Sequence, residues 1–146
     1  NAARSGGKFI PYGTSTGTLE KGKSIPTEED VSKATNAGDL TSAAPYPVKL
    51  YPPNPLGLYQ MGDNGYAWVL DWYQASYYHD SPKNNPQGPM QGEDKVVRGL
   101  PHGEGWGGAL TMERYHRKPD LIASDGDKET AAPYTFRCVV NAEAVK

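Results

Sequence analysis

The alternation of large and small side chains over residues 66–73, YAWVLDWY, predicts a β-strand at the centre of the chain. Successive side chains of a strand point to opposite faces, so every second residue belongs to the same face. One face is formed by Tyr66, Trp68, Leu70 and Trp72. Three aromatic side chains on one face bury a large apolar area, and the pattern therefore predicts that this strand lies in the core.

Shorter patterns predict the other elements. Thr27 precedes three acidic residues, which suit a helix N-terminus, so residues 27–34 are expected to form a short helix or, alternatively, a solvated charged loop. Apolar and β-branched residues predict short strands at 48–50, 95–98, 109–117 and 134–140. Residues 9–22 are expected to be a strand end and a loop, and residues 79–93 a loop rich in Pro, Asn and Gly.

Composition narrows the class of protein. The chain has 146 residues, enough for one domain with a real core, and its 17 Gly and 13 Pro indicate a turn-rich domain of mixed α and β structure. A net charge of −2 gives no support for nucleic acid as a partner. No apolar run reaches the length of a transmembrane segment. The single Cys excludes an internal disulfide.

Four segments carry a resemblance to a known family. They are AARSGG at 2–7, PPNPLGLYQMGDNGYAWVLDWY at 52–73, KVVRG at 95–99 and FRCV at 136–139. In this order and spacing they resemble the formylglycine-generating enzymes, also called sulfatase-modifying factors. The resemblance implies an α+β, C-type-lectin-like fold with short strands and many long loops. It also implies that residues 1–146 are the distal part of one domain whose upstream half is a required partner, so this piece is expected not to fold alone.

The thiol content departs from that family. The resemblance implies oxidation of a substrate Cys by O₂ at a copper site made by two Cys, which follow an RGGSW motif. Here the corresponding segment, residues 98–119, reads RGLPHGEGWGGALTMERYHRKP and has no Cys. Thiolates are what make a soft copper site, and Cys138, in the FRC motif, lies outside the oxidising pair. The sequence therefore predicts the fold of the family without its oxidase activity.

Two metals are candidate cofactors. The resemblance implies calcium at the turn Asp63, Asn64 and Gly65, although Ala67 stands where the family has a Glu ligand, and at a second loop containing Asn36 and Asp39. Because Asn and Asp are also common loop residues, a structural role for them is the alternative. A non-heme iron triad needs two His and one carboxylate, and these could be supplied by His102, His116 and Glu104. The alternative for these residues is a solvent-exposed Gly-rich loop.

Aromatic residues flank the loops that border the family's substrate cleft. Aromatic side chains on loops over a rigid scaffold suit the binding of a protein or peptide, and the alternative is that these rings fill space between loops. The predicted binding cleft consists of Trp68, Tyr77, Tyr78, His102, Glu104, Trp106 and Tyr115. Structural roles are predicted for Asp71, Trp72, Arg98, Arg137 and Cys138. Asp71 is expected to be buried and to accept hydrogen bonds from Arg98 or from nearby main-chain N–H groups.

The sequence as a whole predicts a catalytically silent binding module that recognises a protein partner. By analogy the setting is an exported bacterial protein, in the periplasm or anchored through an upstream lipoprotein signal, for example an immunity protein that neutralises a toxin. The alternative is a metal-dependent oxidase, with iron or copper, of the formylglycine-generating and sulfoxide-synthase superfamily. A third possibility is a carbohydrate-binding domain stabilised by calcium.

Overall fold

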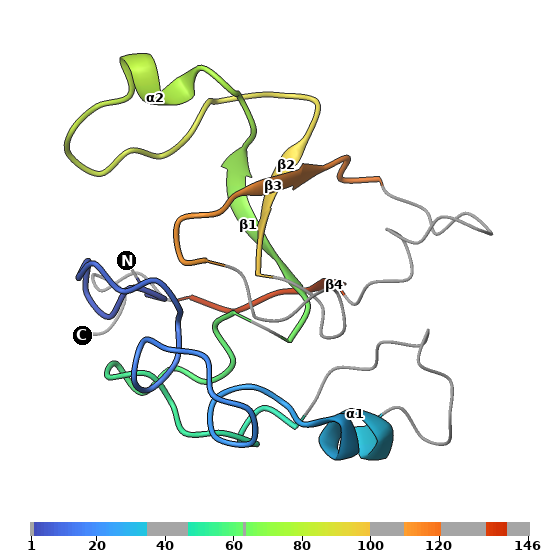
Figure 1. The fold of residues 1–146 in the computed structure, drawn as a ribbon. Coiled ribbons are helices and arrows are strands. Elements are labelled where there is room, and N and C mark those ends of the chain that lie inside the picture. Colours follow the sequence, from blue (N-terminus) through green and yellow to red (C-terminus); the bar gives the residue numbers. More distant parts are fainter. Residues whose placement is uncertain (1, 35–46, 63, 100–109, 121–133, 140–146) are drawn as a thin grey trace, which may run out of the picture.

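A four-stranded sheet organises the described part of the chain (Figure 1). The computed structural model describes residues 2–34, 47–62, 64–99, 110–120 and 134–139. The strands are β1 (Tyr66–Trp72), β2 (Lys95–Arg98), β3 (Tyr115–Arg117) and β4 (Tyr134–Thr135), in the order β3-β2-β1-β4. The two helices are α1 (Glu28–Ala34) and α2 (Tyr77–Asp80). In the view of Figure 1, α2 lies above the sheet and α1 lies below it.

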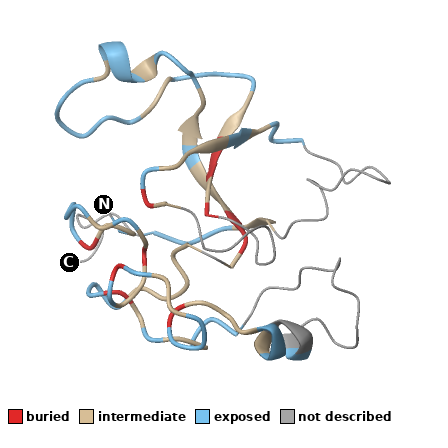
Figure 2. Ribbon diagram, viewed as in Figure 1, coloured by how far each residue is buried: buried red, intermediate tan, exposed pale blue. Residues whose placement is uncertain are grey.

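The aromatic core cluster lies on one face of this sheet, and Val96, which is 1% exposed, is buried on the other face. β1 pairs antiparallel with β2 and parallel with β4, and β2 pairs antiparallel with β3. Tyr66 and Val97 are buried at the centre, and Trp68, Tyr115 and Tyr134 pack around them. The buried residues of the sheet gather where β2 lies beside β1 (Figure 2). The prediction of β1 as a core strand is therefore confirmed for its first half.

A β-bulge changes the second half of β1. The register with β2 shifts between Trp68 and Trp72, so extra residues of β1 have no direct partner on β2. Leu70 is 84% exposed as a result, and the prediction that it shares the buried face is wrong. Lys95 stabilises the irregularity: its Nζ donates to the Leu70 carbonyl at 2.8 Å and lies 3.9 Å from the centre of the Trp72 ring.

Asn54 fixes the proline-rich turn that leads into β1. Its side chain is only 3% exposed, and its Oδ1 accepts hydrogen bonds from the N–H groups of Leu56 and Leu58 at 3.0 and 3.1 Å. Its Nδ2 donates to the Ala2 carbonyl at 2.9 Å. The amide thus ties the turn at 52–58 to the N-terminal segment. Its hydrogen bonds offset the free-energy cost of removing a polar side chain from water.

Several predicted strands are shorter than expected. Residues 95–98 form β2 as predicted, whereas β3 and β4 occupy only parts of 109–117 and 134–140. Residues 48–50 form a turn closed by a hydrogen bond from the Leu50 N–H to the Pro47 carbonyl, so the strand predicted there is wrong. The segment 9–12 finds its partner within the chain, because Tyr12 forms a β-bridge with Leu110.

Helix α1 confirms the prediction from its acidic N-terminus. Thr27 and Asp30 cap it reciprocally: the Thr27 N–H and hydroxyl donate to Asp30 Oδ2 at 3.0 and 2.6 Å, and the Asp30 N–H donates to Thr27 Oγ1 at 3.2 Å. The Tyr51 hydroxyl donates to the same carboxylate oxygen at 2.7 Å. The bonds from Thr27, followed by the bond from Tyr51, lower the pKa of Asp30 from 3.8 to about 2.

Asp30→Asn is expected to lower the free energy of unfolding at neutral pH by about 0.5–1 kcal/mol, because the partly exposed carboxylate is screened by solvent. The folded-state pKa of Asp30 is depressed, so its contribution is present above the unfolded pKa of about 3.9 and is lost as the pH falls toward about 2. Urea denaturation at several pH values should show the two proteins converging over that range. Glu28→Gln, an exposed change of the same charge in the same helix, should show no such convergence.

Candidate functional site

Two arginines face each other on the side of the sheet opposite the aromatic core. Val97 of β2 lies opposite Tyr115 of β3, so in the same antiparallel register the next residues, Arg98 and Arg114, are also opposite each other. Side chains alternate along a strand, and the arginines therefore point away from the face that carries Val97 and Tyr115. We call Arg98 and Arg114 the arginine pair.

Aromatic rings surround Arg114. Its guanidinium carbon lies 4.8 Å from the centre of the Tyr78 ring and 5.9 Å from that of Tyr73. Tyr73 in turn stacks on His116, with ring centres 4.0 Å apart and an interplanar angle of 16°. His116 Nδ1 forms a hydrogen bond with the Asp94 carboxylate. The result is a continuous series of cationic and aromatic side chains from α2 to β3.

Arg98 is half-buried beneath this series. One of its terminal nitrogens donates to the Thr111 carbonyl, which fixes the side chain against the segment before β3. Burial lowers the pKa of Arg98 from its usual value, because the charged guanidinium loses hydration. Tyr78 and Asp71 oppose that change, while the positive charge of Arg114 adds to it. The arginine nevertheless remains charged, because the pKa of a guanidinium is far above neutral pH.

The predicted hydrogen bond between Asp71 and Arg98 is not formed. The register places Arg98 opposite Ala67, and the Arg98 guanidinium donates to the Thr111 carbonyl rather than to Asp71. Asp71 is half-buried rather than buried. It lies beside Gly88, because a Cβ added to Gly88 would be 3.1 Å from the Cβ of Asp71. Within the described residues no hydrogen bond to its carboxylate is formed, so this structural prediction is wrong.

The residues of the predicted cleft lie on two sides of the sheet. Trp68 and Tyr115 pack against the core cluster, whereas Tyr78 of α2 lies beside Arg114 on the other face. Tyr77 accepts a hydrogen bond from the Gly88 N–H at 3.0 Å and so holds the loop that follows α2. The other three predicted cleft residues, His102, Glu104 and Trp106, lie outside the described residues.

The candidate metal ligands are only partly described. Gly65 is buried with a φ of 104°, as expected for a tight turn, and Asn64 is half-buried beside it. Asp63, Asn36 and Asp39 lie outside the described residues. Across the described ranges, no three His, Cys, Asp or Glu side chains are grouped to hold a metal ion. Calcium at this turn stays a prediction.

Two further predicted structural residues lie in the segment after β4. Arg137 donates to the main-chain carbonyls of Tyr59 and Gln60, the residues that precede the turn into β1. Partial burial of its guanidinium lowers the pKa of Arg137 from its usual value. Cys138 is exposed.

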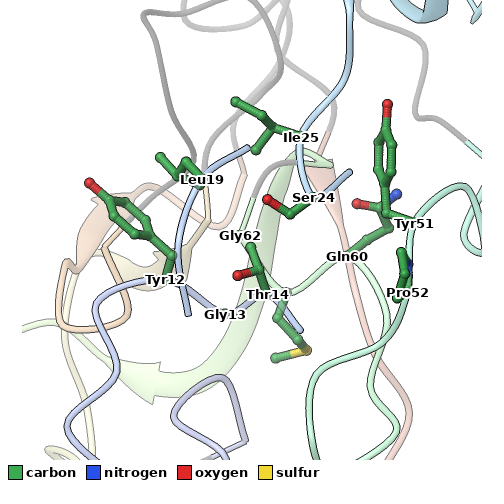
Figure 3. Close-up of a pocket in the computed structure, with 11 residues that line it drawn as sticks. Tyr12, Gly13, Thr14, Leu19, Ser24, Ile25, Tyr51, Pro52, Gln60 and Gly62 are labelled. Carbon is green, nitrogen blue, oxygen red and sulfur yellow. The ribbon is translucent and has the colours of Figure 1, made fainter. Parts of the chain in front are cut away.

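A pocket lies between the N-terminal segment and this turn (Figure 3). Its walls come from residues 12–14, 19, 24–25, 51–52 and 60–62. Gln60 has a φ of 49°, and its side-chain nitrogen is buried without a hydrogen-bond partner in the described part of the chain. The pocket was not predicted, because its walls are separated in sequence and carry no periodic pattern.

The comparison with known families decides what kind of domain this is. The model of the sulfatase-modifying factor enzyme 1-like domain matches residues 1–142. This chain belongs to that family. The α+β fold expected for a formylglycine-generating-enzyme-type domain is thereby confirmed.

Curated relatives of this sulfatase-modifying factor domain carry different names. It is 32% identical over 151 residues to the serine/threonine-protein kinase pkn1 of Chlamydia pneumoniae. That alignment covers 89% of this chain and 23% of the kinase. It is 32% identical over 108 residues to the formylglycine-generating enzyme of Streptomyces coelicolor, covering 73% of this chain and 31% of that protein. The Bos taurus formylglycine-generating enzyme is 36% identical over 66 residues, which is 44% of this chain and 17% of that enzyme. The chain thus spans less than a third of each relative.

The sulfatase-modifying factor domain also brings together residues that sequence patterns did not connect. Tyr73 follows β1, Asp94 precedes β2 and Arg114 precedes β3, and His116 was considered only as an iron ligand. In the structure His116 is engaged by Asp94 and Tyr73. The alternation in β1 places Tyr73 on the face opposite Trp72, which is the one available sequence signal. The helices in the described ranges are too short and polar to cross a bilayer.

Proposed function

We propose that this sulfatase-modifying factor domain is a catalytically silent module that binds a protein or peptide partner. The observation that carries the proposal is the series formed by Arg114, Tyr73 and Tyr78 on the face of the sheet opposite the aromatic cluster. Tyr78 is 65% exposed, and its ring is held by Arg114 rather than packed in the core. Tyr and Arg are enriched at the energetic centres of protein interfaces.

Two further observations support this function. The chain contains a single Cys, Cys138, which is exposed in the segment after β4. Two thiolates in one place are the expected requirement for copper-dependent oxidation of a substrate Cys, and one thiol does not supply them. The curated relatives include both a kinase and formylglycine-generating enzymes, so membership of the family leaves the activity open.

The cellular location expected for such a module, an exported bacterial protein, is also a proposal. An exported bacterial protein, for example an immunity protein, has to recognise another protein rather than transform a small molecule. A bound calcium ion at Asn64 and Gly65 would stiffen the turn that leads into β1 without taking part in recognition. Neither point is needed for the binding function itself.

The first test is enzymatic. The copper-loaded protein, incubated in air with a Cys-containing sulfatase-type peptide, is expected to leave the Cys intact when the peptide is followed by mass spectrometry. A metal-free sample is the background, and an iron-loaded sample with oxygen-consumption measurement covers the alternative oxidase. Turnover above background with either metal would contradict the proposal.

The second test is a binding experiment. A random peptide library displayed on phage and selected against the protein is expected to enrich a shared motif. The affinity of a selected peptide should fall for Tyr78→Ala, measured by fluorescence polarisation, and stay unchanged for Phe136→Ala. Phe136 is 78% exposed and follows β4, which lies at the opposite edge of the sheet from β3, so its truncation is a matched loss of an exposed ring. Selected motifs that bind both variants equally would place recognition elsewhere.

A further inference from the structure

The arginine pair concentrates positive charge that the described residues do not neutralise. Like charges directly opposite each other on neighbouring strands destabilise a sheet. Arg98 forms one hydrogen bond, to the Thr111 carbonyl, and Arg114 has only ring contacts, and neither forms an ion pair within the described part of the chain. A half-buried guanidinium with unused donors is costly unless a ligand fills them. The pair therefore has the character of a site for an anion.

The rings that hold Arg114 also orient it. The guanidinium carbon of Arg114 lies 5.9 and 4.8 Å from the two tyrosine ring centres, within the range of cation–π attraction, and its N–H groups form no hydrogen bond within the described residues. Those N–H groups form a planar fork that fits the two oxygens of a carboxylate. Arg98, opposite Arg114 and half-buried, supplies a second set of donors at the base of the same site.

The surrounding charges select among anions. Asp71 is close enough to act on the charge of Arg98, and Asp94 lies at the far end of the series, where it engages His116. Arg98 and Arg114 carry two positive charges and the nearby Asp71 carries one negative charge, which leaves room for a single further negative charge, whereas a phosphate group carries about 1.5 to 2 charges at neutral pH. The balance of charge therefore favours a monoanion over a phosphate.

We propose that Arg98 and Arg114 form a carboxylate-binding site, walled by Tyr73 and Tyr78, that recognises a Glu or Asp side chain of a peptide partner. The inference rests on the proposed binding function and names the chemistry of the partner: an acidic segment. The carboxylate accepts hydrogen bonds from the edge of the Arg114 guanidinium and from the free donors of Arg98. The aliphatic part of the acidic side chain lies against the exposed Tyr78 ring.

The test uses a fluorescein-labelled, capped peptide of sequence Gly-Glu-Glu-Glu-Gly and its counterpart with Gln at the three central positions. Fluorescence polarisation at low ionic strength is expected to show binding of the Glu peptide, with an affinity at least about tenfold above that of the Gln peptide. The affinity should fall with added salt, because part of the attraction is between exposed charges. Equal binding of the two peptides would overturn the proposal.

Variants assign the effect to the arginine pair. Arg114→Gln is expected to weaken binding of the Glu peptide by about tenfold or more, and Arg98→Lys should also weaken it, because lysine keeps the charge and loses the planar fork. Arg4→Gln is the matched control, since it removes the same charge from the N-terminal segment, where Arg4 contacts Lys8 and Phe9. An Arg114→Gln protein that is folded by circular dichroism and binds the Glu peptide like the wild type would refute the site.

Two outcomes separate this inference from the proposed function. If library-selected peptides bind but their affinity is unchanged by Arg114→Gln, the binding function stands and the carboxylate site is refuted. If inorganic phosphate competes for the site more strongly than acetate at equal concentration and ionic strength, the site is a phosphate site, and the assignment to carboxylate is wrong. Turnover of the Cys peptide would instead refute the proposed function.

Discussion

Gly99→Ala is expected to lower the free energy of unfolding by about 3 kcal/mol, one of the two largest effects of a single substitution that the structure predicts. Gly99 directly follows β2 and has a φ of 90°. Residues other than glycine rarely adopt this backbone conformation. An added Cβ would lie 2.7 Å from the Gly65 carbonyl oxygen, at the turn that begins β1. The substitution therefore combines backbone strain with a clash against another main chain, which cannot rotate away.

Gly57→Ala separates these two contributions. Gly57 also has a positive φ, of 76°, but an added Cβ there would meet nothing within 4 Å. Its replacement should cost only the strain, about 1–2 kcal/mol. Urea denaturation followed by tryptophan fluorescence gives both losses, and the difference between them measures the close approach of Gly99 to Gly65. Equal losses would show that Gly99, at the end of β2, does not approach the Gly65 carbonyl closely.

Local sequence signals predicted the elements whose formation depends on near neighbours. The capping pair Thr27 and Asp30 lies within one helical turn, and α1 forms where those residues place it. The apolar alternation after Tyr66 predicted β1, and the apolar and β-branched residues at 95–98 predicted β2. In α1 the stabilising contact joins residues three positions apart, and in β1 the alternation itself marks the side chains that pack in the core.

Register could not be predicted in the same way. The bulge in β1 depends on how β2 pairs along it, and it exposes Leu70 although the alternation places that residue on the apolar face. The same pairing puts Arg98 opposite Ala67 and leaves Asp71 beside Gly88. A shift of register moves side chains between faces or along the strand, and no local pattern specifies it.

The candidate site shows the same limit. The predicted cleft grouped aromatic residues by their place in loops, yet Tyr115 belongs to the core cluster, and Tyr78 lies on the opposite face. Arg114 had no sequence signal of its own, because its significance depends on facing Arg98 across the β2–β3 pair. The role of a charged residue can be inferred only when its neighbours in space are known. Here two arginines face each other without an ion-pair partner in the described residues, and this arrangement favours a ligand-binding role.

Tyr66→Ala is expected to have the other large effect, a loss of about 3–5 kcal/mol in the free energy of unfolding. Tyr66 is 5% exposed and is the central ring of the core: its centre lies 5.6 Å from that of Tyr115 and 5.5 Å from that of Tyr134. The guanidinium carbon of Arg117 lies 5.6 Å from the same ring. Removing it leaves a cavity bounded by Val97, which has no exposed area, and the sheet cannot close over it without shifting β2.

Phe136→Ala provides the control for loss of a ring without loss of packing. Phe136 is 78% exposed, so its truncation should change the free energy of unfolding by no more than about 0.5 kcal/mol. Both variants are compared by urea denaturation, with the fluorescence of the three Trp as the signal. Since Tyr66 lies on the face opposite the arginine pair, the fraction of Tyr66→Ala protein that remains folded should still bind the Glu peptide. A loss for Tyr66→Ala as small as that for Phe136→Ala would show that this aromatic cluster does not hold the sheet together.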